Sequence, residues 1–307
     1  MTTLDDLLAG KPSDEPPSAD PPQGPPGGPP SGSGSGPARG GSSAEYEFPP
    51  QPGRTARAFI SVGSAVALGL DVLRLTVTRK FQVREFIEQF WFIASVSIVP
   101  AALVAIPFGA VIALQLGTLT VQIGAQSFTG AAAVLAVVQQ ASPIVTALMI
   151  SGAAGTAICA DLGARTIRDE IDAMAVLGIS PVHRLVVPRV WGAVFVAILL
   201  NGMVSVVGIV GGYVFNVIVQ GGTPGAYLAS FSALARLSDL LIGEFKAAIF
   251  GFLGGVVASY RGLHPRPGPK GVGDAVNESV VITFVLLFMV NLVITTLYLQ
   301  LVPPRVG

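Results

Sequence analysis

Five long apolar stretches constrain this chain more than any other feature of its sequence. They cover about residues 90–114, 131–160, 189–219, 237–258 and 279–302. Each is long enough to cross the roughly 30 Å of hydrocarbon in a bilayer as an α-helix. Hydrophobic residues make up 51% of the chain, charged residues only 12%, and the mean hydropathy is +0.68. We therefore predict an all-α membrane protein with about five transmembrane helices.

Proline positions and polarity refine the first two predicted spans. Pro100 and Pro107 lie inside the first span and predict a kink or two half-helices, and Pro143 lies inside the second. Residues 115–130 are polar but uncharged, so we expect a loop between these spans.

The sequence before the first span divides into two parts. Residues 1–53 are rich in Pro, Gly and Ser and bury too little apolar surface to offset their ordering entropy, so this tail is predicted to be disordered. Residues 54–307 form the predicted membrane domain. Its first segment, 55–82, carries apolar residues at steps of three and four, but Asp71 and Arg74 fall in its middle. We expect an amphipathic helix that lies in the membrane interface.

The distribution of Lys and Arg predicts the orientation of the spans. Basic residues precede the first span, are absent between the first and second, and are abundant between the second and third, where Arg165, Arg168, Arg184 and Arg189 lie. The same alternation continues to the C-terminus. The positive-inside rule therefore places the N-terminus in the cytoplasm and the C-terminus outside.

The most charged stretch of the second half, residues 162–188, falls in one of these cytoplasmic connections. Its periodicity predicts an amphipathic helix over 162–178, with Ile167, Ile171, Met174 and Leu177 or Gly178 on one face. Gly178 and Pro181 mark its end. Pattern alone leaves two interpretations open: a solvated connector at the membrane surface, or a helix that contacts something outside the bilayer.

Small residues recur every four positions in three of the spans and predict close helix packing. Cys159, the single cysteine, belongs to the first of these stripes and excludes a disulfide within the chain. The stripes are Ser151, Gly155, Cys159 and Gly163; Gly208 and Gly212; and Gly251 and Gly255.

Glu244 and Lys246 are charged residues inside the fourth apolar stretch. Charges at such a depth face a protein interior or a wet cavity. They are two positions apart, so they cannot pair on one helix face. One interpretation is an ion pair between helices. The other is a cavity that receives a charged headgroup.

Other motifs are absent and exclude several functions. The chain has no Walker A loop and no nucleophile–base motif, and its two histidines, His183 and His264, are too far apart in sequence to suggest a metal site. Its net charge of zero implies no nucleic acid partner. A protein of this kind, without chemistry of its own, is typical of a subunit that another protein drives.

Several motifs resemble one family. They are G-A-A-G-T-A-I-C-A-D-L-G at 152–163, E-I-D-A-M at 170–174 with Gly178 and Pro181 downstream, and Pro188-Arg189. They resemble the MlaE/YrbE permeases, the membrane subunits of ABC transporters that move lipids with MCE proteins. The resemblance covers about residues 55–302, and the Pro-rich tail is similar to that of YrbE subunits of actinobacterial Mce systems. Two positions depart from the pattern: Ser259, and Asn291 where an acidic residue is expected.

The resemblance implies a transport subunit of the plasma membrane that is not an enzyme. The 162–178 helix would be the coupling helix, docked on a cytoplasmic ATPase pair that binds the ATP and Mg²⁺, with no cofactor in this chain itself. A second, non-identical permease chain, a ring of MCE proteins and a lipid would complete the system. The rivals are a secondary transporter that uses Glu244 and Lys246, and an intramembrane enzyme. The implied coupling residues are Arg165, Arg168, Glu170, Ile171, Asp172, Met174 and Gly178.

Overall fold

A computed structural model describes residues 54–79, 81–124, 129–218, 221–234 and 237–301. Helices and turns make up these residues, with no strand among them, which confirms the all-α prediction. The predicted disordered tail, residues 1–53, lies outside the described residues.

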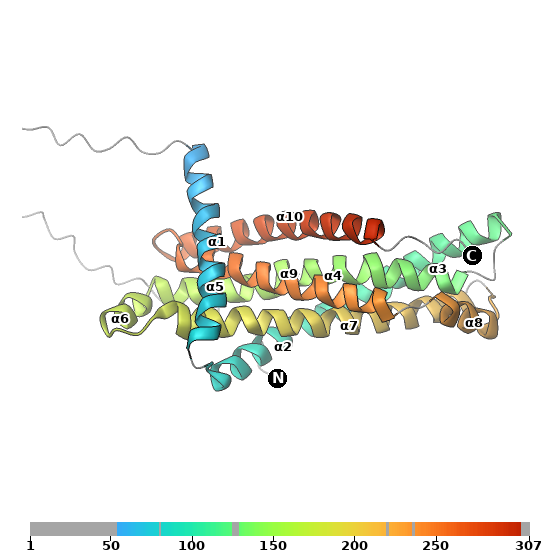
Figure 1. Ribbon diagram of the computed structural model, residues 1–307, viewed down its shortest axis with the longest axis horizontal. Helices are drawn as coiled ribbons and strands as arrows, with labels where there is room; N and C mark the ends of the chain where they lie inside the picture. The colour runs from blue at the N-terminus through green and yellow to red at the C-terminus, as the bar shows by residue number, and fades with distance from the viewer. Residues whose placement is uncertain (1–53, 80, 125–128, 219–220, 235–236, 302–307) are drawn as a thin grey trace, which may run out of the picture. The chain divides into compact units, whose positions relative to one another are not determined.

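The predicted spans all exist as helices, and most are longer than predicted. They are α2 (Val83–Gln122), α7 (Val187–Ile218), α9 (Leu237–Leu263), α10 (Pro269–Leu301) and a segmented helix from residue 129 to residue 166. Figure 1 shows them running alongside one another. With the first helix, they make six helices that are long and apolar enough to cross a membrane.

The first helix, α1 (Arg54–Thr78), crosses the others near the end of the bundle where α6 lies (Figure 1). Its buried residue Val72 packs against Val190 on α7 and Val256 on α9. The Trp191 indole donates a hydrogen bond of 2.9 Å to the Thr76 hydroxyl. Contact with short stretches of several helices is expected of a helix that lies across a bundle. Its position in the membrane interface stays a prediction.

The first span differs from its prediction. The helix α2 is 40 residues long and continues to Gln122, so the loop expected over 115–130 is wrong in its first half. Pro100 and Pro107 lie within the helix and do not divide it in two. Its buried face explains the continuity: small residues recur every four positions, and Gly117 extends them into the region expected to be a loop. These buried residues are Ser97, Ala101, Ala105, Gly109, Ala113 and Gly117.

The second span is divided by two π-helical turns. In chain order it consists of α3 (Thr129–Ala136), η3 (Val137–Ala141), α4 (Ser142–Met149), η4 (Ile150–Ala154) and α5 (Gly155–Thr166). A third π turn, η5 (Val182–Val186), leads into α7. The sequence showed no sign of these turns, which are frequent at functional sites. A further short helix, α8 (Pro224–Leu234), was also not predicted.

The three stripes of small residues lie at helix contacts. A Cβ atom on Gly251 would come within 2.6 Å of the Val194 Cα on α7, and one on Gly208 within 2.9 Å of Val137 on η3. A Cβ atom on Gly163 would approach Val272 on α10 at 2.8 Å. The backbones of these helices meet at distances that a larger side chain would prevent.

Candidate functional site

The charged stretch after the second span forms a corner and not one helix. Helix α5 ends at Thr166, and α6 (Glu170–Val176) begins after a turn. Asp169, in this turn, has a φ of 58°, a left-handed conformation that Asp tolerates better than most residues. The continuous helix predicted over 162–178 is therefore wrong, because this turn redirects the chain.

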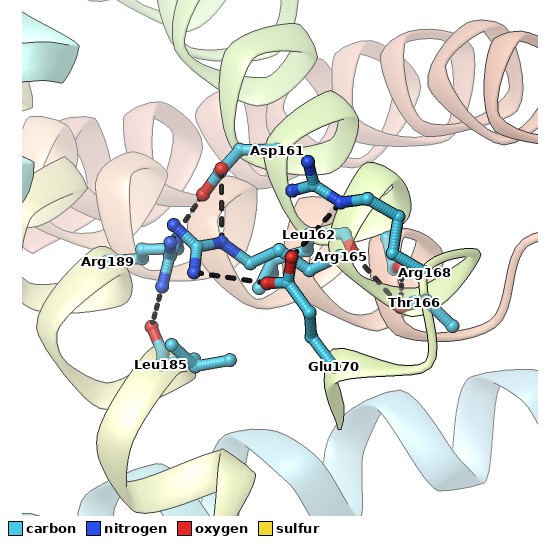
Figure 2. Close-up of polar contacts among 9 residues, drawn as sticks. Asp161, Leu162, Arg165, Thr166, Arg168, Glu170, Leu185 and Arg189 are labelled. Carbon is cyan, nitrogen blue, oxygen red and sulfur yellow. Dashed lines mark hydrogen bonds and ion pairs between the residues drawn. The ribbon is translucent and has the colours of Figure 1, made fainter. Parts of the chain in front are cut away.

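An ion-pair chain braces the inside of this corner (Figure 2). The Glu170 carboxylate, at the start of α6, lies 3.0 Å from Arg168 Nε and 3.6 Å from Arg165 Nη1. Arg165 in turn pairs through its Nε with Asp161, one turn earlier on α5, at 3.2 Å. These four side chains connect α6 to the last two turns of the second span.

Arg189 extends the chain of ion pairs to α7. Its side chain is 0% exposed, and its Nη2 donates to the Asp161 carboxylate. Its Nη1 donates to the Leu185 carbonyl oxygen at 2.8 Å. The sequence placed Arg189 among the charges of a loop, but it lies within α7, where the Asp161 carboxylate compensates its buried charge. We call Asp161, Arg165, Arg168, Glu170 and Arg189 the ionic corner.

A further contact joins the corner to α9. The Thr166 hydroxyl lies 3.1 Å from the Gly262 carbonyl oxygen, near the end of α9. Asp161 and Thr166 therefore connect the end of α5 to α7 and α9.

The two faces of α6 have different environments. Ile171 and Met174 pack, partly buried, against the core of this chain. Val176 and Leu177 point away from it and are 87% and 74% exposed, and Asp172 is exposed beside them. The apolar contact expected from Ile171 and Met174 thus faces inward, because the turn at 167–169 changes which face of α6 points outward.

Gly178 ends α6 as predicted. It has a φ of 73°. The Gly178 N–H donates to the Ala175 carbonyl at 3.0 Å, and the Ile179 N–H donates to the Met174 carbonyl at 3.0 Å. This pair of bonds is a Schellman motif, which requires the left-handed conformation that glycine adopts without strain. It fixes the exposed end of α6.

Glu244 and Lys246 lie far from this corner and point toward different helices. The Glu244 Oε1 accepts a hydrogen bond of 3.1 Å from the Asn201 side chain on α7, and its Oε2 has no hydrogen-bond partner among the described residues. Lys246, 2% exposed, donates to the Thr295 hydroxyl on α10 at 2.8 Å and to the Gln139 carbonyl on η3 at 3.3 Å. The two charges do not meet.

Neutral groups continue this network between α4 and α7. The Ser142 hydroxyl lies 2.7 Å from the Asn201 carbonyl oxygen and 2.8 Å from the Asn201 side-chain oxygen. Ser205 donates to Ser142 at 2.9 Å. Asn201 therefore joins these buried hydroxyls to Glu244. Lys246 has a separate set of hydrogen bonds, but its partners are neutral as well. Because neutral groups surround both charges, we call Glu244, Lys246, Asn201, Ser142 and Ser205 together the neutral network.

Two further features of the described residues concern metal ligands and the single cysteine. No group of three His, Cys, Asp or Glu side chains comes together there to hold a metal ion. Cys159 is buried among core residues in the packing stripe.

Sequence reasoning missed the link between Asp161 and Arg189. Both residues belong to quoted motifs, A-D-L-G and Pro188-Arg189. A signal existed, because Arg189 opens the third predicted span, and a charge buried in a span needs a partner. Asn201 gave a weaker signal, as an amide near the middle of the third predicted span.

Comparisons with known proteins identify relatives over most of this fold. The family model described as Permease MlaE matches residues 86–297, more than half of the 307 residues. A probable ABC transporter permease protein of Rickettsia bellii is 29% identical over 247 residues, which are 80% of this chain and 95% of the relative. One of Synechocystis is 28% identical over 80% of this chain and 91% of its own length. Protein TRIGALACTOSYLDIACYLGLYCEROL 1, chloroplastic, of Arabidopsis thaliana is 26% identical over 58% of this chain and 51% of its own length.

Proposed function

Because the chain belongs to the MlaE permease family, we propose that it is the membrane subunit of an ABC transporter that moves lipid, and that α6 is its contact with the ATPase. The observation that carries this proposal is the ionic corner. It ties a short helix with an exposed apolar tip to α5 and α7, so that a push on α6 moves the spans as a rigid body.

The exposed face of α6 supplies the contact that docking requires. Val176 and Leu177 offer an apolar tip, and Asp172 offers a charge next to it. An apolar tip beside a charge lets a partner combine burial of apolar surface with electrostatic complementarity. Arg165, Arg168 and Glu170 hold α6 in place from the inside, and Ile171 and Met174 seat it on the core.

We propose the other components from the resemblance to the MlaE/YrbE permeases. ATP and Mg²⁺ would bind to the ATPase pair, with no cofactor in this chain. A second, non-identical permease chain would complete the membrane unit, and a ring of MCE proteins would receive or deliver lipid on the outer side of the plasma membrane. The name of the Arabidopsis relative contains that of a glycolipid, which favours a lipid cargo.

We also propose that a lipid headgroup binds at Glu244 or Lys246, but the two residues differ in how accessible they are. Lys246 is enclosed by η3, α9 and α10. A lipid headgroup would therefore reach it only in a state in which these helices separate. Glu244, with a carboxylate oxygen that accepts no hydrogen bond from the described residues, is the better candidate of the two.

The decisive experiment changes the exposed face of α6 and leaves the corner intact. We expect Asp172→Lys or Val176→Glu to weaken ATPase co-purification by at least about tenfold, as loss of one hot spot does. ATP-dependent lipid transfer between proteoliposomes should fall in parallel. Lys270→Glu is the matched control, since Lys270 is exposed on α10 and lies outside α6.

Two outcomes would contradict the proposal. Variants that retain the ATPase and transfer lipid normally would exclude α6 as the docking element. Transfer that needs only an ion gradient, and is abolished by Glu244→Gln, would favour the rival secondary transporter.

A further inference from the structure

A groove on the outer face of the bundle lies between α1, α9 and α10. Its volume is about 510 Å³. Volumes of this size are typical of small-molecule sites. Its walls are apolar side chains of all three helices, and Tyr260 and Arg261 line it as well. The apolar wall residues include Val62, Val66, Leu70, Phe252, Val256 and Ile282.

The groove exists because α1 has two apolar faces. One face, which includes Val72, packs against α7 and α9. The other face carries Val62, Val66 and Leu70, which are exposed and line the groove. Because α1 crosses the bundle (Figure 1), this second face and the sides of α9 and α10 together line the groove.

The one cationic side chain among the residues that line the groove is Arg261. Its Nη1 pairs with Glu278 on α10 at 2.9 Å, and its side chain is 26% exposed. A guanidinium has five N–H donors. The Glu278 bond occupies one of them, so the group has the capacity to bind a phosphate as well.

We propose that this groove binds an anionic phospholipid from the leaflet at the α6 end, with an acyl chain along α1 and the phosphate at Arg261. An apolar trough with a cation in its lining complements an amphiphile with one negative group. Each buried methylene of such a chain contributes about 0.8 kcal/mol.

The lining of the groove favours a lipid as its occupant. Arg261 is the one charged side chain among its otherwise mostly apolar lining residues, which matches an amphiphile with a single anionic group. The site is separate from the proposed function, since it binds lipid whether or not the chain transports it.

Photo-crosslinking in nanodiscs tests the proposal directly. The intact complex is reconstituted in phosphatidylcholine with a trace of phosphatidylglycerol that carries a photoreactive acyl chain, without ATP. We expect crosslinks to concentrate on residues 61–73 and 252–257, and unlabelled phosphatidylglycerol to compete for them about tenfold better than phosphatidylcholine, as expected for a charge-assisted contact.

Variants separate the two parts of the site. Ala65→Trp fills the groove and should abolish these crosslinks, whereas Ala67→Trp, on an exposed position outside the lining, should leave them unchanged. Arg261→Gln should remove the preference for phosphatidylglycerol, and Glu278→Gln should strengthen it by releasing Arg261. Arg266→Gln is the control, because Arg266 also faces an acidic residue of α10, Asp274, at 3.8 Å.

Three results would overturn the proposal. Equal labelling by both lipids would show ordinary annular contact. Labelling unchanged in Ala65→Trp would place the lipid elsewhere. Crosslinks from the groove to another protein of the complex, with no lipid label, would show a protein occupant. All are measured without transport, so failure of lipid transfer leaves them interpretable.

Discussion

The ionic corner and the neutral network both bury charge, but they compensate it in different ways. In the corner, Arg189 faces the carboxylate of Asp161. In the network, Lys246 donates to a hydroxyl and a carbonyl, and Glu244 accepts from an amide. Opposite charges hold the corner in one geometry. A neutral hydrogen-bond partner, by contrast, can be exchanged for another at a smaller cost in free energy.

This difference suggests a division of labour along the bundle. The corner joins α5, α6 and α7 through charged side chains that have few alternative hydrogen-bond partners. A connection that transmits motion between helices requires such fixed contacts. The network lies beside the π turn η3, whose Gln139 carbonyl it uses as an acceptor. If the chain transports lipid as proposed, a region of exchangeable hydrogen bonds would suit the part of the bundle that has to change shape.

The largest effect on stability should come from removing one residue of the buried Asp161–Arg189 ion pair. Asp161→Ala leaves the Arg189 charge without its carboxylate, and we expect a loss of about 3–5 kcal/mol in the free energy of unfolding. Denaturant titration in detergent, followed by tryptophan fluorescence, measures it. Lys246→Met is the comparison, because it removes a charge held by neutral groups. An equal loss in both variants would erase the distinction between the two regions.

A smaller effect is expected within the neutral network. Asn201→Leu removes the amide that joins Ser142 to Glu244. We expect a loss of about 1–3 kcal/mol, the usual cost of leaving a buried polar group unsatisfied. The same unfolding titration applies, with Ser95→Ala as control, since the exposed Ser95 bonds only to its own helix at Phe92. A loss as large as that of Asp161→Ala would make the network as rigid as the corner.

The smallest effect on stability should come from Glu170→Gln. Its partners Arg165 and Arg168 are substantially exposed. Exposed pairs contribute at most about 1 kcal/mol, and salt weakens them. We expect near-normal unfolding but reduced coupling, measured as the ATPase activity that added lipid stimulates. Full stimulation in this variant would remove Glu170 from the path between α6 and the spans.

The apolar stretches of the sequence alone predicted much of the fold, whereas the candidate site depends on local turns that the sequence did not indicate. The five spans were predictable because each has to satisfy its backbone within a helix. The end of the first span was not, since residues 115–122 are polar, although Ala113 and Gly117 continue the buried stripe. The corner was hidden because a turn of three residues at 167–169 decides which face of α6 points outward. Ile171 and Met174 were therefore expected outside, where Val176 and Leu177 lie.

The central claim, that α6 is the contact with the ATPase, can be tested by thiol labelling. The chain has one cysteine, Cys159, and it is buried. A Val176→Cys variant therefore places a single accessible thiol on α6, and Lys270→Cys places one on α10 at the same end. Binding of the ATPase should slow maleimide labelling at position 176 by at least about tenfold, as a contact of hot-spot strength would, and leave position 270 unchanged. Equal labelling at position 176 with and without bound ATPase would contradict the account.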